Sequence, residues 1–463
     1  MSEKGGQQKS QPSLAKGALS ALESTIMGIA GTSPAFTVAV TTGTIYAAIG
    51  PLSVGSLLYS GVIMLGIMFA FANLNRVMPD AGAAFAWVGS VFGPVWGFFA
   101  GWGLMVASVV FMVSATLPAA TATLLLFAPD QVENTPLVTA IAAIWLTLVT
   151  AIVLRGIKHA STAQVTVTVI EAAIVVALLG AAVYWFGATP AHAPSLSWIA
   201  PGSFTFKSFA DGAIVSVFFY WGWDVTMNLG EETEPEDAST GAFWAMINLI
   251  VFFVILMTVV LIALSDKEIA AANTNVLYAI SSKIFPAPWS YLVVLATVLS
   301  TVGALETQIL QFSRSMYSMA RAGVLHPRYA AVHREWQTPW AATLVIWGLG
   351  LVLLFAASYM PSVAAILESS IEAIGLQICF YMGLTGYASA WHFRGLLRTD
   401  LREGFTHVVM PLLGALFMTG VAVWVIPTFS AVVLTVGIGG LALGFIPLSI
   451  GWWRNRQGGI VPA

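Results

Sequence analysis

The feature of this sequence that most constrains its fold is a succession of long apolar runs. A helix that crosses the hydrocarbon core of a bilayer needs ~20 mostly apolar residues, and twelve runs of this kind can be read along the chain. They lie near residues 22–48, 52–73, 93–126, 136–154, 162–187, 208–229, 240–264, 288–318, 339–357, 361–390, 407–426 and 430–453. Because 58% of the 463 residues are hydrophobic and only 8% are charged, a soluble globular chain is excluded. The sequence therefore predicts an all-α integral membrane protein with twelve transmembrane helices.

The basic side chains fall mainly on one side of the predicted membrane. Lys and Arg prefer cytoplasmic loops. If the N-terminus is cytoplasmic, that side holds fifteen of the 18 Lys and Arg, which leaves only Lys207, Lys267 and Lys283 on the other side. This asymmetry predicts an even number of spans and a multi-pass protein of the plasma (inner) membrane with both termini in the cytoplasm. Residues 1–16 are polar and the first apolar run is too long for a signal peptide, so none is expected.

Acidic side chains stand in or beside the predicted spans without any Lys or Arg among them. There are seven, namely Glu23, Glu171, Asp211, Asp224, Glu306, Glu368 and Glu372. A charge at the bilayer centre costs about 2.5–3.5 kcal/mol on insertion scales, so an unpaired carboxylate there suggests a function. The excess of acid predicts a protein that handles protons or cations. A carboxyl that is protonated or that lies at a helix end is the structural alternative.

Other classes of protein fit the composition less well. The net charge of −3 and the lack of a dense basic stretch give no support to nucleic-acid binding. The single cysteine, Cys379, cannot form a disulfide within the chain, and the six histidines fall in loops or at span ends, so neither a metal site nor a cofactor is expected. An integral-membrane enzyme would need a nucleophile with a plausible base. A cation channel would use rings of carboxylates in an oligomer rather than acids on different spans of one chain.

Two predicted spans are interrupted by helix-weakening residues. In the first span, Pro34 cannot donate to the carbonyl four residues back, and Gly28 and Gly31 lower the helix propensity beside it. In the sixth span, Gly222 stands among bulky aromatics and Asp224 follows it. Non-helical backbone at that depth is tolerated only where it lines a cavity or is buried in protein. The two breaks are five spans apart, which is typical of an inverted repeat of five plus five helices whose unwound segments hold the substrate; two unrelated kinks are the alternative.

Three motifs occur in the order and at the spans typical of one transporter superfamily. They are Gly31-Thr32-Ser33-Pro34 at the first break, Gly222-Trp223-Asp224 with residues 228–233 at the second, and residues 313–323 followed by His326-Pro327 and Thr338-Pro339 between spans eight and nine. Together they resemble the amino acid/polyamine/organocation (APC) superfamily over spans one to ten. The Ser-Pro version of the first motif resembles its putrescine-importer branch.

The resemblance implies a LeuT-like fold of ten core helices plus two, with broken helices 1 and 6. It also implies alternating access around a site at mid-bilayer and a substrate that carries an amino group. We therefore expect a cytoplasmic N-terminal tail at residues 1–20 and a ten-helix inverted-repeat transport core at residues 21–390. Helices 11 and 12 would occupy residues 391–453, and residues 454–463 would form a cytoplasmic C-terminal tail.

The resemblance also implies where the substrate binds. In the superfamily, amides of the span-one break hold the substrate's carboxylate, and carbonyls of both breaks hold its ammonium. The implied binding residues at the breaks are Gly31, Thr32, Ser33, Phe218, Tyr220, Trp221 and Gly222. Phe218 would close over the substrate from the outer side, or would simply pack beside its neighbour, and Trp102 of span three would pack on the substrate's apolar part. Because Pro34 has no N–H to give, the cradle for a carboxylate is weakened.

Glu171 of span five is the most informative single residue. It falls where many proton-coupled members of the superfamily carry a Lys that faces the span-one break. A Glu reverses the sign, so it would either neutralise a cationic substrate or carry the coupled proton, since burial favours the protonated carboxyl; a hydrogen-bonded structural role is the alternative. Glu306 and Gln308 of span eight are further candidate substrate ligands. Ser300 and Thr301, with span-one carbonyls, could instead form an oxygen cage for sodium.

These expectations converge on a secondary active transporter that imports an amino acid or a related amine, with a proton as the coupling ion. The unpaired carboxylates and Pro34 favour a cationic amine or an unusual amino acid. A sodium-coupled amino acid symporter and an amino acid or amine exchanger are the alternatives. The acidic stretch at residues 231–237 is expected to pair with the Arg residues of the loop after span eight as a cytoplasmic gate.

Overall fold

The protein is helical throughout the part of the chain that the computed structural model describes, which is residue 14 and residues 17–272 and 275–457. These residues contain no β-strand, and their one isolated bridge joins Leu19 to Thr233. The predicted all-α class is confirmed. Most of the tails predicted at residues 1–20 and 454–463 lies outside the described residues.

The helices follow the predicted apolar runs closely. The first half of the chain forms α1 Ala21–Thr32, α2 Pro34–Ile49, α3 Ser53–Val77, α4 Ala84–Phe92, α5 Pro94–Phe127, α6 Thr135–Val153, α7 Ile157–Phe186, α8 Phe206–Phe219, α9 Val225–Asn228 and α10 Pro235–Ala263. The second half forms α11 Asp266–Ala272, α12 Val276–Ile284, α13 Leu292–Arg321, α14 Trp340–Ala357, α15 Val363–His392, α16 Leu396–Thr399, α17 Leu401–Gly404, α18 Met410–Val425, α19 Ala431–Leu434, α20 Gly440–Leu443 and α21 Phe445–Gln457. Short π-helical segments at Phe405–Val409 and Thr435–Gly439 join the last helices.

Ten helical stretches among the described residues are long and apolar enough to cross a membrane. The first of them, Ala21–Val77, contains α1 and α2, which Ser33 joins, and α3, which follows a tight turn at Gly50. The broken pair α8 and α9 is not among the ten, because α8 has only 14 residues. The short helices α4, α11, α12, α16 and α17 are not among the predicted spans, since the search for ~20-residue runs passes over elements of this length.

The first predicted span is broken at the expected place. α1 ends at Thr32, Ser33 adopts a left-handed conformation with φ 48°, and α2 starts again at Pro34. Proline at the first position of a helix costs no hydrogen bond, because an N–H group at this position would have no partner within the helix. The break is therefore two helices joined by one residue rather than a gentle kink.

The sixth predicted span is broken as well. α8 ends at Phe219, residues 220–224 form turns, and the four-residue helix α9 follows. Gly222 has φ 111°, a left-handed conformation that L side chains rarely adopt. Glycine at this position allows the chain to turn without strain.

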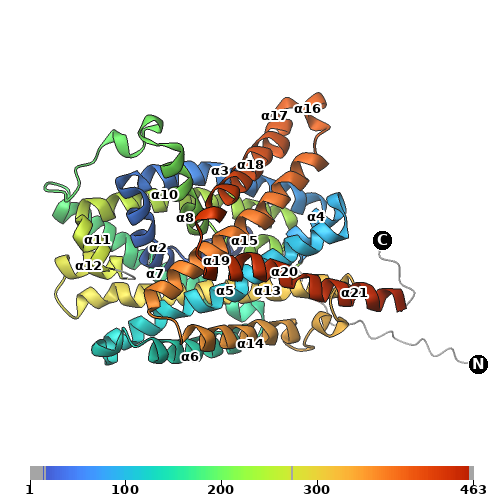
Figure 1. The fold of residues 1–463 in the computed structure, drawn as a ribbon, viewed down its shortest axis with the longest axis horizontal. Coiled ribbons are helices and arrows are strands. Elements are labelled where there is room, and N and C mark those ends of the chain that lie inside the picture. The colour runs from blue at the N-terminus through green and yellow to red at the C-terminus, as the bar shows by residue number, and fades with distance from the viewer. Residues whose placement is uncertain (1–13, 15–16, 273–274, 458–463) are drawn as a thin grey trace, which may run out of the picture.

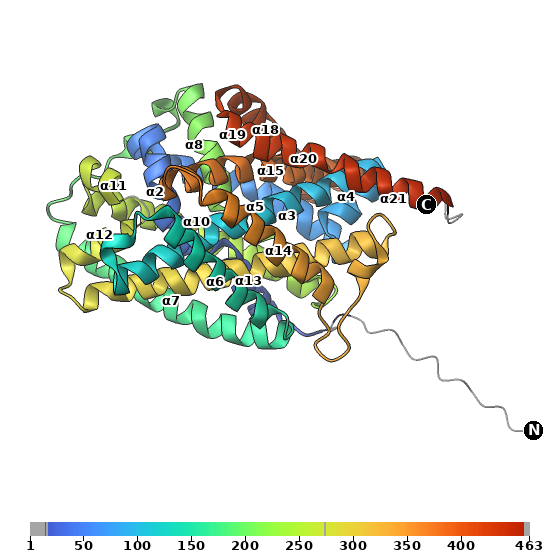
Figure 2. The same ribbon diagram turned by 60° about the horizontal axis from the view of Figure 1, so that its bottom comes forward.

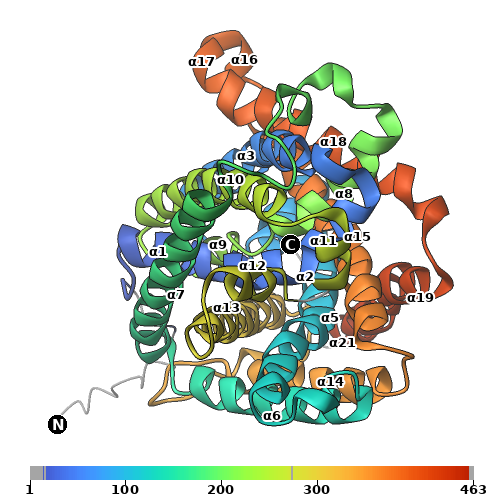
Figure 3. The same cartoon turned by 90° about the vertical axis from the view of Figure 1, so that its left-hand side faces the viewer.

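The helices form an inner bundle with a lipid-facing shell. In the most apolar window of α5, 78% of the residues are buried inside the protein, whereas only 22% are buried in that of Ala431–Arg454. α5 packs along α13 and α15, and α1 and α3 pack along α10. α6 and α14 lie together on one side of this bundle, and α19 and α21 lie on another (Figures 1 and 3).

Both ends of the described chain lie at the same end of the bundle, which we call the near end. The Ala18 N–H donates to the Glu232 carbonyl at 2.8 Å, and the Arg454 guanidinium donates to the Leu325 carbonyl at 2.6 Å, just after α13. The opposite end, here called the far end, carries α11 and α12 (Figure 2). A chain whose ends lie on one side has crossed the bundle an even number of times.

Candidate functional site: two helix breaks in contact

The two helix breaks touch each other through their backbones. A Cβ added to Gly31 would lie 2.2 Å from the Gly222 carbonyl oxygen, and a Cβ added to Gly222 would lie 2.2 Å from the Gly31 carbonyl oxygen. Neither position has room for a side chain. The sequence placed these two glycines about 190 residues apart on different spans, and the fold brings them together as one site.

The start of α2 is held by side chains of two other helices. The Ala35 N–H donates to Glu171 Oε1 at 3.2 Å and the Phe36 N–H donates to Ser300 Oγ at 3.1 Å. Both acceptors are buried, with Glu171 5% and Ser300 1% exposed. A helix N-terminus has unpaired N–H groups and a partial positive charge, so a carboxyl group is favourable there. Glu171 and Ser300 therefore reach the span-one break from α7 and α13.

A small cavity adjoins this contact. Its volume is about 170 Å³, and Pro34, Thr168, Glu171 and Asn248 are among the residues that line it. Glu171 thus has a hydrogen bond to the break on one side and empty space beside it.

A hydrogen-bonded network fixes the second break. Trp221 Nε1 donates to the Tyr381 hydroxyl at 2.7 Å, and that hydroxyl donates to Asp224 Oδ2 at 2.7 Å. Gln311 Nε2 donates to the same carboxylate oxygen at 2.7 Å and also to Asn228 Oδ1 at 3.1 Å. The network ties the break to α13 and α15, which agrees with the structural alternative for Asp224.

Aromatic rings cover the breaks from the side of α5. Phe111 packs edge-on against Trp221 with ring centroids 5.2 Å apart, and against Phe36 at 5.7 Å. Phe218 lies 6.3 Å from Phe111 in a tilted arrangement. Phe218 and Trp221 therefore belong to one cluster at the breaks. Sequence reasoning missed Phe111, Tyr381 and Gln311, because one ring among 27 Phe and polar residues on other spans carry no motif of their own.

Two other candidate side chains form hydrogen bonds with helices outside the breaks. The Tyr220 hydroxyl donates to the Leu57 carbonyl of α3 at 2.8 Å. Trp102 Nε1 donates to the Gly440 carbonyl of α20 at 2.8 Å, and the Trp102 ring stacks on Phe98. The contacts of these two side chains are thus to neighbouring helices rather than to the site.

The polar residues of α13 divide among its faces. Glu306 is six residues after Ser300, about 240° around the helix, so its carboxyl leaves α13 on a different face from the side chain that meets the break. Gln308 accepts a hydrogen bond from the Ser108 hydroxyl of α5 at 3.3 Å. The Thr301 hydroxyl donates to the Thr297 carbonyl of its own helix at 2.9 Å. Of the two candidate sodium ligands, only Ser300 reaches the break.

Ion pairs close the near end of the bundle. Arg314 makes two hydrogen bonds of 3.0 Å to Glu232, and both side chains are fully buried. Arg321 binds Asp80 at 2.9 Å and Glu231 at 2.5 Å, and these three groups are partly exposed. Glu231 and Glu232 of the acidic stretch are therefore paired as expected, but their partners lie on α13 itself rather than in the loop that follows, because α13 continues to Arg321. Arg314 is buried within the helix of the eighth predicted span, so the expectation that no Lys or Arg stands among the spans is wrong for this residue.

The same end is linked to the second break. Asn228 Nδ2 donates to the Ala81 carbonyl at 2.9 Å, and the Ala81 N–H donates to Glu231 Oε1 at 3.0 Å. The network that holds the break therefore continues without interruption into the ion pairs.

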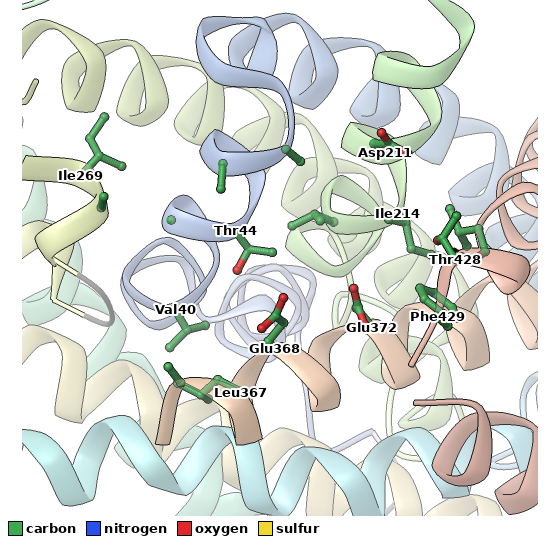
Figure 4. Close-up of a pocket in the computed structure, with 17 residues that line it drawn as sticks. Val40, Thr44, Asp211, Ile214, Ile269, Leu367, Glu368, Glu372, Thr428 and Phe429 are labelled. Carbon is green, nitrogen blue, oxygen red and sulfur yellow. Dashed lines mark hydrogen bonds between the residues drawn. The ribbon is translucent and has the colours of Figure 1, made fainter. Parts of the chain in front are cut away.

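The far end of the bundle contains a cavity. A cavity of about 600 Å³ lies between α2, α8, α11 and α15. Figure 4 shows Glu368 and Glu372 of α15 pointing into it, with Thr44 of α2 opposite and Asp211 of α8 at one side. This cavity is an acidic vestibule, and we keep that name for it below.

Comparison with known proteins identifies the family. The family model described as "Amino acid permease" matches residues 19–449. The low-affinity putrescine importer PlaP of Escherichia coli (strain K12) is 23% identical over 404 residues, which cover 83% of this chain and 83% of the relative. The branched-chain amino acid permease BcaP of Lactococcus lactis is 25% identical over 390 residues, 79% of this chain and 80% of the relative. The serine/threonine exchanger SteT of Bacillus subtilis is 23% identical over 309 residues, 64% and 67% of the two chains. The predicted membership of the APC superfamily is confirmed.

Proposed function

We propose, from the premise that this chain belongs to the amino acid permease family, that it is a secondary active transporter importing an amino acid or related amine by alternating access. The observation that carries the proposal is the contact between the Gly31 and Gly222 backbones, which joins two broken spans into one site. The proposed path runs from the acidic vestibule to this site, and the ion pairs of the near end block it on the other side. In this reading the protein is in the state whose far end is open.

The proposal includes twelve spans in a LeuT-like arrangement. The ten long stretches become twelve when Ala21–Val77 is counted as two crossings and the broken pair α8 and α9 as one. The breaks then fall on spans one and six, as an inverted repeat of five plus five helices requires. The excess of Lys and Arg favours a cytoplasmic near end. The vestibule then faces the external medium of the plasma membrane.

The charges of the interior favour a cationic substrate. Among the described residues the buried charged side chains are Glu171, Asp224, Glu232, Glu306 and Arg314. The one cation of this set, Arg314, is already paired with Glu232. The remaining carboxyl groups have no basic partner, so the interior as a whole is acidic and the transfer of an ammonium group into it from water costs less.

The start of α2 favours a substrate without a free carboxylate. Pro34 has no N–H, and the next two amides are engaged by Glu171 and Ser300. The Ser33 N–H donates to the Ile29 carbonyl and the Thr37 N–H to the Ser33 carbonyl, both at 2.9 Å. A substrate carboxylate would have to displace one of these bonds. The cradle that Thr32 and Ser33 were expected to provide is thus largely occupied by the protein itself.

Glu171 is the proposed coupling group. Its carboxyl lies at the junction of α2, α7 and α13 and adjoins a small cavity. The charged form is stabilised by the N-terminus of α2, and the neutral form loses that attraction. Proton uptake would therefore loosen the contact between α7 and the span-one break, which is a local step that a transport cycle can use.

Ligand binding to the purified protein tests the site assignment. A ligand at 100 times its Kd stabilises a protein by about 2.7 kcal/mol, so a thermal-shift screen of short aliphatic amines, diamines and amino acids reports binding. We expect amines to stabilise the protein more than the amino acids of equal length. The Gly222→Val variant, whose side chain would fill the contact with Gly31, should show no shift with any of them. A ligand that stabilises both proteins equally binds elsewhere and contradicts the assignment.

A further inference from the structure

Three segments meet at the far end of the bundle around one histidine. Tyr46 lies near the end of α2, His192 in the connection between α7 and α8, and Asp266 at the start of α11. The Tyr46 hydroxyl donates to Asp266 Oδ1 at 2.7 Å, and His192 Nε2 lies 2.6 Å from the same oxygen and 3.0 Å from the hydroxyl. Hydrogen bonds from Ala191 and His192 to the carbonyls of Ile262 and Leu261 fix the connection against α10.

The two nitrogens of His192 both face acceptors. Nδ1 lies 2.8 Å from the Leu261 carbonyl oxygen, which has no proton to give. Nε2 faces the Asp266 carboxylate, which also only accepts when ionised. The Tyr46 hydroxyl has a single proton, and the bond to Asp266 uses it. An imidazolium, which donates from both ring nitrogens, satisfies both of these contacts at once.

The charged groups around this cluster support the same assignment. Lys283 of α12 is occupied by Glu268 at 2.8 Å and by the Ala263 carbonyl at 2.8 Å, and Lys267 is exposed beside Asp266. The hydrogen bonds from Tyr46 and then from His192 hold the pKa of Asp266 below its usual range. Asp266 thus stays ionised in mild acid. The ion pair between His192 and Asp266 exists only while His192 is protonated.

The same segments form walls of the acidic vestibule. Ala47 and Ala48, which follow Tyr46 on α2, line the cavity. Ile269 and Ala270, one turn after Asp266 on α11, line it as well. A bond between Tyr46 and Asp266 therefore fixes the distance between two walls of the mouth.

We propose that Tyr46, His192 and Asp266 form a proton-dependent latch that holds α2 and α11 together at the mouth of the vestibule. Protonation of His192 fixes the Asp266 carboxylate in position to accept from Tyr46. Deprotonation removes the positive charge of the imidazole and with it the ionic attraction that holds the Asp266 carboxylate in this position. On the proposed orientation, external acid would keep the mouth in the observed shape and external alkali would release it. This proton is distinct from the one assigned to Glu171, because the latch lies at the end of the bundle and not at the breaks.

The distance between α2 and α11 measures the latch directly and does not depend on transport. Spin labels on Ala48→Cys and Ala270→Cys in a Cys379→Ala background report it by pulsed electron paramagnetic resonance in nanodiscs. The measurement is made without substrate at about pH 5.5 and about pH 8.5, on either side of the histidine range. We expect one narrow distance population in acid. In alkali that population should fall by about two- to fivefold, the size expected of a partly exposed ion pair.

Variants separate the latch from other titrating groups. His192→Gln keeps a polar side chain and should give the same distance distribution at both pH values, as should Asp266→Asn. Tyr46→Phe should broaden the distribution at both pH values, because α2 then has no bond to Asp266. His326→Gln at the near end is the matched control and should retain the wild-type response. A distribution that ignores pH in the wild type, or a pH response that survives in His192→Gln, overturns the proposal.

Discussion

The contact between the two breaks depends on the absence of a Cβ atom at two glycines. Gly31 and Gly222 were singled out from the sequence because glycine beside proline or bulky aromatics weakens a helix. The structure gives the stronger reason, since a Cβ at either would lie 2.2 Å from the carbonyl oxygen of the other. The sequence does not show which backbone packs against each glycine, because this depends on packing between spans that no local pattern records.

The first prediction concerns these glycines. Gly31→Ala should abolish uptake, because the added Cβ forces the backbones of the two breaks apart, while insertion into the membrane stays normal. Gly348→Ala on α14 is the matched control, since a Cβ there meets no atom within 4 Å. Uptake of a labelled amine by cells that carry each variant, normalised to the amount of protein in the membrane, compares the two. Equal uptake by both variants would mean that the breaks need not touch.

The second prediction concerns Glu171. Glu171→Gln keeps the shape of the side chain and can still accept from the Ala35 N–H, but it neither titrates nor carries a charge. If Glu171 carries the coupled proton, the variant should retain counterflow, which needs no net proton movement, and lose accumulation driven by a pH gradient. Loss of both activities would assign Glu171 to substrate binding instead.

Glu306→Gln controls for the removal of a buried carboxyl in general. Glu306 is 2% exposed and lies on another face of α13. We expect this variant to keep both counterflow and accumulation. Wild-type behaviour of Glu171→Gln in both assays would reduce Glu171 to a structural residue.

The positions of the helices along the chain were predicted better than the contacts between helices. The limits of the apolar runs agree with the helices to within a few residues, because a hydrophobic stretch of bilayer length leaves the backbone one option, a helix that satisfies its own hydrogen bonds. Trp102 shows the limit of this reasoning. Its place on the third predicted span was correct, but its side chain contacts α20 rather than the breaks. The rotation of a helix about its own axis depends on all the helices that pack against it. A helix that is apolar on all sides gives little indication of this rotation in its sequence.

The third prediction compares the two ion pairs that close the near end. Arg314→Gln leaves Glu232 buried without a partner, which costs about 3–5 kcal/mol, so its unfolding temperature should fall well below that of the wild type. Arg321 is 41% exposed, and the pairs it makes stabilise the fold by only about 0–1 kcal/mol. Arg321→Gln should therefore fold normally and open the near end more often.

A cysteine at a buried position beside the ion pairs measures how often the near end opens. Ala81 is fully buried and its N–H donates to Glu231, so Ala81→Cys in a Cys379→Ala background should react slowly with a thiol reagent. Adding Arg321→Gln should speed the reaction several-fold. An unchanged rate would show that these pairs do not hold the near end shut.

At the scale of the whole molecule, the asymmetry between its two ends is the main result. One end carries buried and partly exposed ion pairs, and the other holds a cavity of about 600 Å³ with carboxylates in its wall. Counting Lys and Arg in the sequence predicts an even number of crossings, and both ends of the described chain do lie at one end of the bundle. It does not predict that the ion pairs and the cavity lie at opposite ends, because this depends on how the spans pack in one conformation.

Proton-driven accumulation in proteoliposomes tests the central claim most directly. The purified protein is placed in vesicles with an alkaline interior and sodium-free buffers, and uptake of a short labelled aliphatic diamine is followed over time. The account predicts that the diamine accumulates above its external concentration, that a protonophore abolishes the accumulation, and that added sodium changes nothing. Equal concentrations inside and outside under the imposed gradient, or a strict requirement for sodium, would contradict it.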